Sequence, residues 1–171
     1  MSDPVIETKN LILRKPDQRD TAAAVEFYIS ERGRFAGAQT IGQAWRAHAK
    51  MVGHWTLCGF GMFTITDRET SAPIGMCGPY FPGDWPEREL GWHIWSADHE
   101  GKGVAFEAAK AARKYVYDVL GWNTAVSYID LENHRSRNLA KRMGASLDND
   151  AMKPEGSNCV VYRHPSREAL S

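Results

Sequence analysis

The chain has 171 residues, of which 43% are hydrophobic, which is enough for one sizeable core and too little for two. We therefore expect a single domain over residues 1–171. Lysine plus arginine and aspartate plus glutamate both total 21, so no net charge exists to attract nucleic acid or an anionic membrane surface. Any site for an anion must be local.

The cysteines and the start of the chain point to a soluble, cytoplasmic protein. Cys58, Cys77 and Cys159 have neither the spacing of a zinc site nor that of a disulfide framework, so we expect reduced thiols. Residues 1–4 begin no basic segment followed by an apolar run, and no apolar stretch approaches the ~20 residues of a membrane helix. The six histidines include no HExxH pattern, so no metal is indicated.

The first part of the chain predicts one strand and two helices. Residues 8–15 place Leu11 and Leu13 on one face, which is typical of a strand with one buried side. Residues 19–30 and 41–57 carry apolar side chains at helical spacing. In the second helix the expected buried stripe is Ile41, Trp45, Ala49, Val52 and Trp55.

The remaining chain alternates short strands with helices. Residues 61–66, 73–81 and 88–95 are rich in aromatic and β-branched residues and are separated by turn formers, which predicts an antiparallel meander. A strong helical pattern follows Gly103 and is capped by Gly121. The last elements expected are a strand at 124–131, a helix at 135–143 and a strand at 158–163. This order predicts a mixed α/β (α+β) class.

A glycine-rich turn, Glu100-Gly101-Lys102-Gly103-Val104-Ala105, joins the third strand of the meander to the strongest helix. A helix start leaves N–H groups unpaired and carries the positive end of the helix dipole, which favours an anion. Gly101 and Gly103 would let a diphosphate approach the backbone closely. The turn does not match a nucleoside-triphosphate loop, because Gly103 follows Lys102 where Ser or Thr is needed. It does not match a dinucleotide loop either, because Phe106 replaces the third glycine. Taken alone, the glycines could equally well only shape the entry into the helix.

A second segment, residues 128–136, closes a strand with polar residues and opens a short helix. With it, the sequence resembles the GNAT superfamily of N-acetyltransferases, specifically the RimJ/RimL-type branch of ribosomal-protein N-terminal enzymes. The family's motif Gln/Arg-x-x-Gly-x-Gly/Ala is matched by residues 100–105 except at the first position. Its later motif, Asn-x-x-Ser before a helix ending in Gly-Phe, matches Asn133, Ser136 and Gly144, with Ala145 in place of Phe. Two motifs in this order are far more specific than either alone.

The resemblance implies the GNAT-like acyl-CoA N-acyltransferase fold, with a mixed, mostly antiparallel central sheet and flanking helices, and acetyl-CoA as cosubstrate. Residues 88–95 and 124–131 would be parallel strands that splay apart and admit the pantetheine arm, which Asn133 would hydrogen-bond. The implied cofactor contacts are Ile94, Trp95, Gly101, Lys102, Gly103, Val104, Ala105, Asn133 and Ser136. One of Arg135, Arg137, Lys141 and Arg142 could meet the nucleotide phosphates, although for any single one of them an ordinary solvated helix face is the favoured explanation.

Two departures from the family pattern leave alternatives open. Glu100 stands where the family has Gln or Arg, and since a carboxylate repels a diphosphate, we expect Glu100 to point to solvent. The tyrosine that other branches use as an acid has no counterpart before Gly144. A module that binds acyl-CoA without turnover therefore stays an alternative, as does an enzyme that uses a longer acyl-CoA.

Direct transfer to an amine requires a base, because an amine of pKa about 10.4 must lose a proton before it attacks. Glu89, in the strand that enters the glycine turn, is the predicted base. Glu87 and His93, on the same strand face, are the next candidates. A structural or surface role for Glu89 stays equally open.

The resemblance also suggests groups for the thioester. Backbone N–H groups of residues 94–96 would polarise its carbonyl. Ser136 could protonate the departing sulfur, although a serine in a first helical turn often bonds its own backbone. Tyr128 is a more distant substitute. A covalent route through Cys58 or Cys77 is not favoured, because neither is paired with a base at a recognisable spacing.

The acceptor is only partly constrained. A protein N-terminus and a small amine both fit, because fold and cofactor site do not fix the second substrate. The aromatic count leaves room for a homodimer. The expected acceptor wall includes Phe35, Trp45, Trp55, Tyr80 and Trp85, although most of the six tryptophans are expected in the core.

Overall fold

The computed structural model describes residues 3–170, so Met1, Ser2 and Ser171 of the expected domain lie outside the described residues. Its strands form one sheet in the order β1-β2-β3-β4-β5-β6-β8-β7. The strands are β1 Val5–Glu7, β2 Leu11–Arg14, β3 Phe63–Asp67, β4 Pro73–Tyr80, β5 Glu89–Ile94, β6 Val126–Asp130, β7 Ser146–Leu147 and β8 Cys159–Arg163. The α-helices are α1 Thr21–Ile29, α2 Ile41–Cys58, α3 Val104–Asp118 and α4 His134–Arg142. None of the helices described is both long and apolar enough to cross a bilayer.

The pairing of the strands confirms the predicted class. β3, β4 and β5 form the expected antiparallel meander, and β5 with β6 is the parallel pair among the strands described. The crossover between these two strands contains α3, as a parallel connection requires. The sheet is therefore mixed and mostly antiparallel.

The prediction of one strand over residues 8–15 was wrong at its beginning. β1 and β2 form an antiparallel hairpin, and residues 8–10 form its turn. Glu107 of α3 accepts hydrogen bonds from Thr8 Oγ1 at 2.6 Å and from the Asn10 backbone N–H at 2.8 Å. This contact ties the hairpin to α3 across the sequence, so local alternation could not reveal it.

Helix α2 has the predicted bounds within one residue but buries a different face. A capping box starts it, with Thr40 and Gln43 each bonding the other's backbone, and Gly59 ends it at φ 75°. The buried side chains are Ala44, His48, Met51, His54 and Trp55. Ile41 and Trp45 are 68% and 55% exposed, so the expected stripe was wrong at these positions. Trp55 of the expected stripe is buried, and it shares the inner face with Ala44, His48, Met51 and His54.

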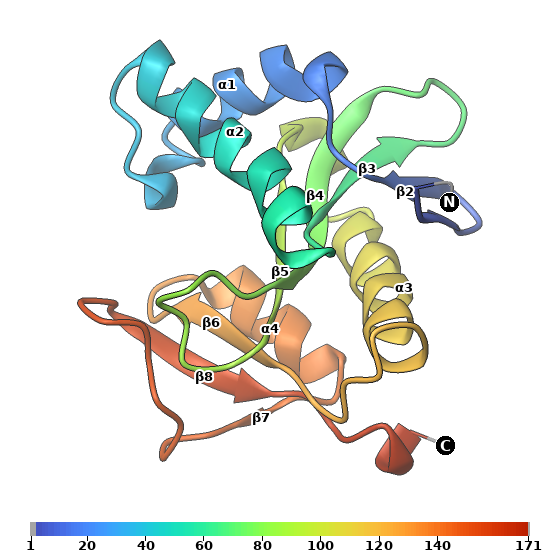
Figure 1. The fold of residues 1–171 in the computed structure, drawn as a ribbon, viewed down its shortest axis with the longest axis vertical. Coiled ribbons are helices and arrows are strands. Elements are labelled where there is room, and N and C mark those ends of the chain that lie inside the picture. Colours follow the sequence, from blue (N-terminus) through green and yellow to red (C-terminus); the bar gives the residue numbers. More distant parts are fainter. Residues whose placement is uncertain (1–2, 171) are drawn as a thin grey trace.

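Helices cover both faces of the sheet, as Figure 1 shows for α1 and α2 above and α3 beside it. One core cluster joins α3 to the strands through Leu90, Ala108, Ala112 and Val116. A second joins α1 and α2 to the sheet and includes Phe27 and Trp95 among its members. Leu90 and Glu89 therefore lie on opposite faces of β5, because successive strand residues alternate.

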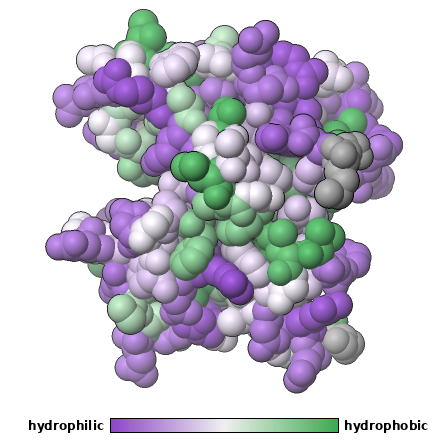
Figure 2. Space-filling model, in the orientation of Figure 1, coloured by the Kyte–Doolittle hydropathy of each residue, from purple (hydrophilic) through white to green (hydrophobic). Residues whose placement is uncertain are grey.

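The sheet opens between β5 and β6. Their register has a single pair, Glu89 with Val126, supported by the bond from Val126 N to Arg88 O at 3.0 Å. β5 continues to Ile94 with no further β6 partner, whereas β6 stays paired with β8 throughout. In Figure 1 β1–β4 lie above β5 and β6–β8 below it, and apolar residues gather at the waist between these parts in Figure 2. The expected splay of the two parallel strands is confirmed.

Candidate active site

The glycine turn after β5 presents a run of unpaired backbone donors. Gly101 and Gly103 have φ of 71° and 82°, and Gly103 is the N-cap of α3 with no side-chain capping bond. Within residues 3–170, the N–H groups of residues 101–106 donate to no backbone or side-chain acceptor. Together with the dipole of a 15-residue helix, these donors form an anion cradle. We call residues 101–106 the cradle.

The two glycines serve the shape of the cradle and its access. A Cβ at Gly101 or Gly103 would meet no protein atom within 4 Å, so the protein interior does not require glycine at either position. The left-handed φ values do, because a side chain there is strained. The space beside both positions is open to an approaching ligand.

Glu100 does not point to solvent, contrary to the expectation from the sequence. Its side chain is 30% exposed and pairs with Arg32 and with Arg135. Burial alone would raise the pKa of Glu100, but the hydrogen bonds and charges of the two arginines lower it below its ordinary value. The carboxylate therefore stays ionised while its charge is balanced by protein cations.

The end of β5 supplies fewer free donors than predicted. The N–H groups of Trp95 and Ser96 both approach Ile74 O of β4, at 2.8 and 3.4 Å, so they are not available to a thioester. Successive strand residues direct their N–H groups to opposite edges. Because that of Trp95 faces β4, that of Ile94 faces the splay, where β6 has departed. Of residues 94–96, only Ile94 has a backbone N–H that is free for the predicted contact with the thioester carbonyl.

Glu89 lies at the point where β5 and β6 begin to separate. Its Oε2 accepts a 2.6 Å hydrogen bond from the indole N–H of Trp85, and the backbone of Tyr128 also bonds its carboxylate. The side chain keeps some exposure, yet protein surrounds the carboxylate. Burial raises the pKa of Glu89 to about 7, against the lowering effect of these hydrogen bonds. A carboxylate with this pKa can exchange a proton near neutral pH.

The other two candidate bases are occupied elsewhere. Glu87 precedes β5 and makes a bidentate pair with Arg163, at 2.8 Å for both contacts. His93 stacks on Phe27, with ring centroids 5.5 Å apart, and its Nε2 lies 3.2 Å from the hydroxyl of Tyr28. Burial, aided by the charge of Lys50, lowers the pKa of His93 to about 3, so its imidazole is a weak base.

Tyr128 lies on the same side of the sheet as Glu89. Its ring meets that of Trp85 edge to face, with centroids 6.2 Å apart. Its hydroxyl is buried and makes no hydrogen bond of normal geometry within the described residues. Burial and the nearby carboxylates of Glu87 and Glu89 raise its pKa to about 12, so the group stays an O–H donor.

The start of α4 faces β5 across the splay. Asn133 caps this helix, because its Oδ1 accepts from Ser136 N at 3.1 Å. The hydroxyl of Ser136 accepts a 3.3 Å bond from the indole N–H of Trp92 on β5. The amide N–H₂ of Asn133 and the hydroxyl proton of Ser136 donate to no group in the described part of the chain. Both stay available as donors toward the opening.

Comparison with known proteins decides the family. The family model described as an Acetyltransferase (GNAT) domain matches residues 10–146, which is more than half of the chain. The chain belongs to the GNAT acetyltransferase family. A solved acetyltransferase from Agrobacterium tumefaciens str. C58 is 33% identical, with 96% of this chain and 95% of that one covered and a TM-score of 0.86.

Two more distant structures share the fold. An acetyltransferase (GNAT family) from Bacillus anthracis is 18% identical, with 94% of this chain and 96% of that one covered and a TM-score of 0.71. The ribosomal-protein-S5-alanine acetyltransferase from Vibrio fischeri is 13% identical, with 97% and 98% covered and a TM-score of 0.73. Both likenesses show the shared fold. The GNAT acetyltransferases are acyltransferase enzymes that use acetyl-CoA.

The aromatic residues expected to line the acceptor site of this acetyltransferase lie in different surroundings. Trp85 lies against Glu89, and its ring meets that of the buried Tyr80 at 5.4 Å. Phe35 is exposed, with its ring 5.5 Å from that of His93 on β5. Trp55 is in the core, where its indole N–H donates to Met62 O, so its place in the wall was wrong. Trp45 projects from the exposed face of α2.

The basic residues of α4 in the acetyltransferase also differ in their surroundings. Arg137 donates to Leu131 O at 3.0 Å, and the guanidinium of Arg142 lies 4.1 Å from the centroid of the Phe106 ring. Arg135 alone of the basic run reaches the glycine turn, through Glu100. Sequence reasoning missed Arg32, which has no motif and is 68 residues from Glu100.

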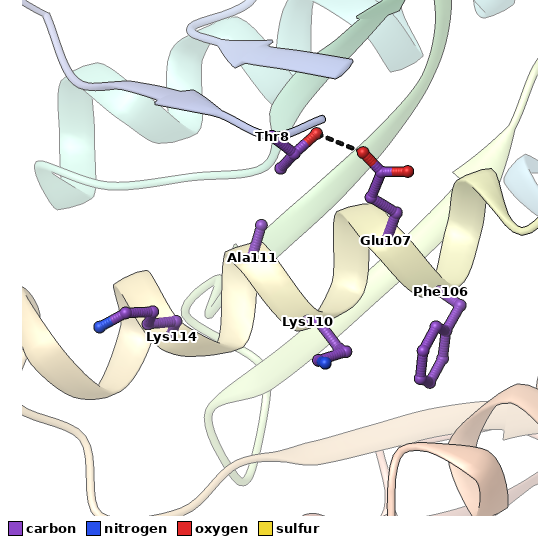
Figure 3. Close-up of a pocket in the computed structure, with 6 residues that line it drawn as sticks. All are labelled: Thr8, Phe106, Glu107, Lys110, Ala111 and Lys114. Carbon is purple, nitrogen blue, oxygen red and sulfur yellow. Dashed lines mark hydrogen bonds between the residues drawn. The ribbon is translucent and has the colours of Figure 1, made fainter. Parts of the chain in front are cut away.

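Other features of the acetyltransferase lie apart from this site. A groove of about 380 Å³ runs along the outer face of α3 and is lined by Thr8, Phe106, Glu107, Lys110, Ala111 and Lys114 (Figure 3). Its lining includes neither Glu89 nor the glycines of the cradle. Burial raises the pKa of Cys77, so this thiol is not activated, and Cys58 is exposed at the end of α2, with its Sγ 3.9 Å from Phe81 O. Residues 3–170 contain no His, Cys, Asp and Glu group placed to hold a metal ion.

Proposed function

We propose that residues 1–171 form one N-acetyltransferase domain that moves an acetyl group directly from acetyl-CoA to a primary amine. One observation carries this proposal: the unpaired N–H groups of the cradle lie at the end of β5, and Glu89, with its pKa of about 7, lies at the start of the same splayed strand. The first feature suits a diphosphate, and the second suits removal of a proton from an ammonium group.

Different residues of this chain bind different parts of acetyl-CoA. The cradle, which contains Gly101, Lys102, Gly103, Val104 and Ala105, binds the diphosphate through main-chain donors. Asn133 offers its amide N–H₂ to the pantetheine arm from the far side of the splay. The N–H of Ile94 faces the opening and polarises the acyl carbonyl. The N–H of Trp95 is bonded to β4, so Trp95 lies at the cofactor site without donating a hydrogen bond from its backbone.

The chemistry then needs one base and one acid. Acetyl-CoA supplies a thioester whose C–S bond breaks as the C–N bond forms. Glu89 takes the proton of the attacking amine, directly or through water, and Trp85 orients its carboxylate. Ser136 donates its hydroxyl proton to the departing sulfur while Trp92 holds its oxygen. A thiol has a pKa of about 8.5, so this help is modest beside that of the base.

The acceptor is a primary amine on a protein N-terminus or a small molecule. The structure from Vibrio fischeri is described as acting on an alanine of a ribosomal protein, which supports a protein N-terminus as one choice. The partly exposed Trp85 offers apolar surface beside Glu89 for the body of either acceptor, and the exposed ring of Phe35 offers more beside His93, further along β5.

The proposal is tested by release of free thiol from acetyl-CoA in the presence of a panel of amines and peptides. Acceptor-dependent release, with an acetylated product in the mass spectrum, supports it. Tight binding of acetyl-CoA with no release for any acceptor would instead identify a binding module. Faster turnover of succinyl-CoA or a longer acyl-CoA than of acetyl-CoA would change the acyl donor and leave the direct transfer intact.

A further inference from the structure

Three segments that are far apart in the sequence meet at the edge of the cradle through charged groups. Glu100 precedes the cradle, Arg32 lies in the link between α1 and α2, and Arg135 lies in the first turn of α4. Glu100 pairs with both arginines, one through each carboxylate oxygen. Since Arg135 belongs to the β6 side of the splay, its pair with Glu100 joins the two sides of the opening.

Arg32 is held firmly in this arrangement. Its Nε lies 3.1 Å from Glu100 Oε1, and its Nη groups donate to Trp95 O at 2.6 Å and to Ile94 O at 2.8 Å. These carbonyls are at the end of β5, which has no β6 partner there. Its side chain is 33% exposed. Because four hydrogen bonds fix it, two of them to Glu100, Arg32 balances the charge of Glu100 whether or not Arg135 is present.

Arg135 is held by far less. Its side chain is 82% exposed, and within residues 3–170 its single polar partner is Glu100. An ion pair this exposed contributes little and exchanges readily. With Arg32 balancing Glu100, Arg135 supplies one uncompensated positive charge directly beside the free N–H groups of the cradle.

We propose that Arg135 is an exchangeable ligand for the diphosphate of coenzyme A, and that Glu100 competes with the diphosphate for it and so lowers cofactor affinity. This inference rests on the proposed function. The Glu100 carboxylate and a phosphate oxygen of coenzyme A are alternative partners for this guanidinium, because carboxylates and phosphates both accept the planar donor fork of arginine. Arg32 keeps Glu100 neutralised after the exchange, which limits repulsion of the diphosphate.

The test is the dissociation constant of coenzyme A by calorimetry for the wild type, R135Q, E100Q and the double variant. We expect R135Q to weaken binding about tenfold and E100Q to tighten it about threefold, the size of a single charge pair near the surface. In the R135Q background, the gain in binding free energy from E100Q should be less than half of the gain that E100Q gives in the wild type. K153Q removes one exposed charge outside the cradle and α4 and should change binding less than twofold. Circular dichroism melts confirm that each variant folds.

The choice of phosphate is tested with 3′-dephospho-coenzyme A, for which R135Q should lose the same factor. A loss that vanishes with this ligand would place Arg135 on the 3′-phosphate and overturn the proposal, as would weaker binding by E100Q. If the wild type binds coenzyme A and R135Q binds it no more weakly than K153Q does, this inference alone is overturned. No heat from the wild type with either ligand would overturn both this inference and the proposed function.

Discussion

The indole N–H of Trp85 donates a 2.6 Å hydrogen bond to Oε2 of Glu89, so a loop residue holds the carboxylate at the start of the splay. Burial raises the pKa of this carboxylate to about 7, and the bond from Trp85 restrains the rise. The pair therefore sets both the direction of the Glu89 side chain and the pH at which it becomes a base.

Replacing Glu89 with glutamine should lower kcat by about 100-fold or more, because general-base catalysis contributes roughly 10²–10⁴-fold. Binding of coenzyme A should change less than about threefold, since the cradle lies at the other end of β5. Steady-state kinetics and calorimetry measure the two effects. If E87Q lost the activity instead and E89Q kept it, the base would be Glu87.

Replacing Trp85 with phenylalanine should move the acid side of the kcat/KM profile to higher pH. The lost bond favoured the ionised form of Glu89, so its pKa rises further and activity appears later as pH increases. A hydrogen bond to a charged group contributes about 1.5–3 kcal/mol, so we expect a shift of about one pH unit. A profile that kept its midpoint near pH 7 while only the maximum fell would contradict this role of Trp85.

E89Q should also be more stable than the wild type at pH 8 but not at pH 4. The pKa of Glu89 is raised from 4.5 to about 7 on folding, so the folded state binds more protons in this window and loses stability as pH rises through it. The upper limit is about 3 kcal/mol, and the partial exposure of Glu89 makes it smaller. Denaturant unfolding at both pH values tests this, and an equal difference at pH 4 and pH 8 would exclude it.

Replacing Ser136 with alanine should lower kcat about tenfold, the smaller share expected for an acid that assists a good leaving group. Coenzyme A affinity should hold within about threefold, because Asn133 still caps α4 through the backbone N–H at position 136. Y128F is the comparison, since the buried hydroxyl of Tyr128 has no hydrogen-bond partner within the described residues and lies on the same side of the sheet as Glu89. A large loss in Y128F with none in S136A would transfer the acid role to Tyr128.

Replacing Gly103 with alanine should weaken coenzyme A binding about tenfold or more. The added Cβ stands on the open side of the cradle, and φ of 82° strains the backbone by roughly 1–2 kcal/mol. G121A is the matched control, because Gly121 also has a left-handed φ, 68°, and open space around it, but lies after α3. Equal losses of affinity in both variants would mean that the strain acts through stability and not through the cradle.

The sequence by itself determined the class, the position of the glycine turn and the order of the elements other than β1 and β7. Local rules suffice for these features. Turn formers separate the strands of the meander, and Gly103 and Gly121 mark the limits of the helical pattern around α3. The choice of Glu89 as the candidate base followed from the chemical need for a carboxylate and from its place in the strand that enters the glycine turn.

Tertiary structure decided what depends on neighbours that are distant in the chain. The buried face of α2, the hairpin turn held by Glu107 and the core position of Trp55 all follow from contacts across the fold. Glu100 is the clearest case, because a carboxylate predicted to face solvent is held by Arg32, which carries no motif. Charge pairing and burial depend on distances in space, and a sequence gives only distances along the chain.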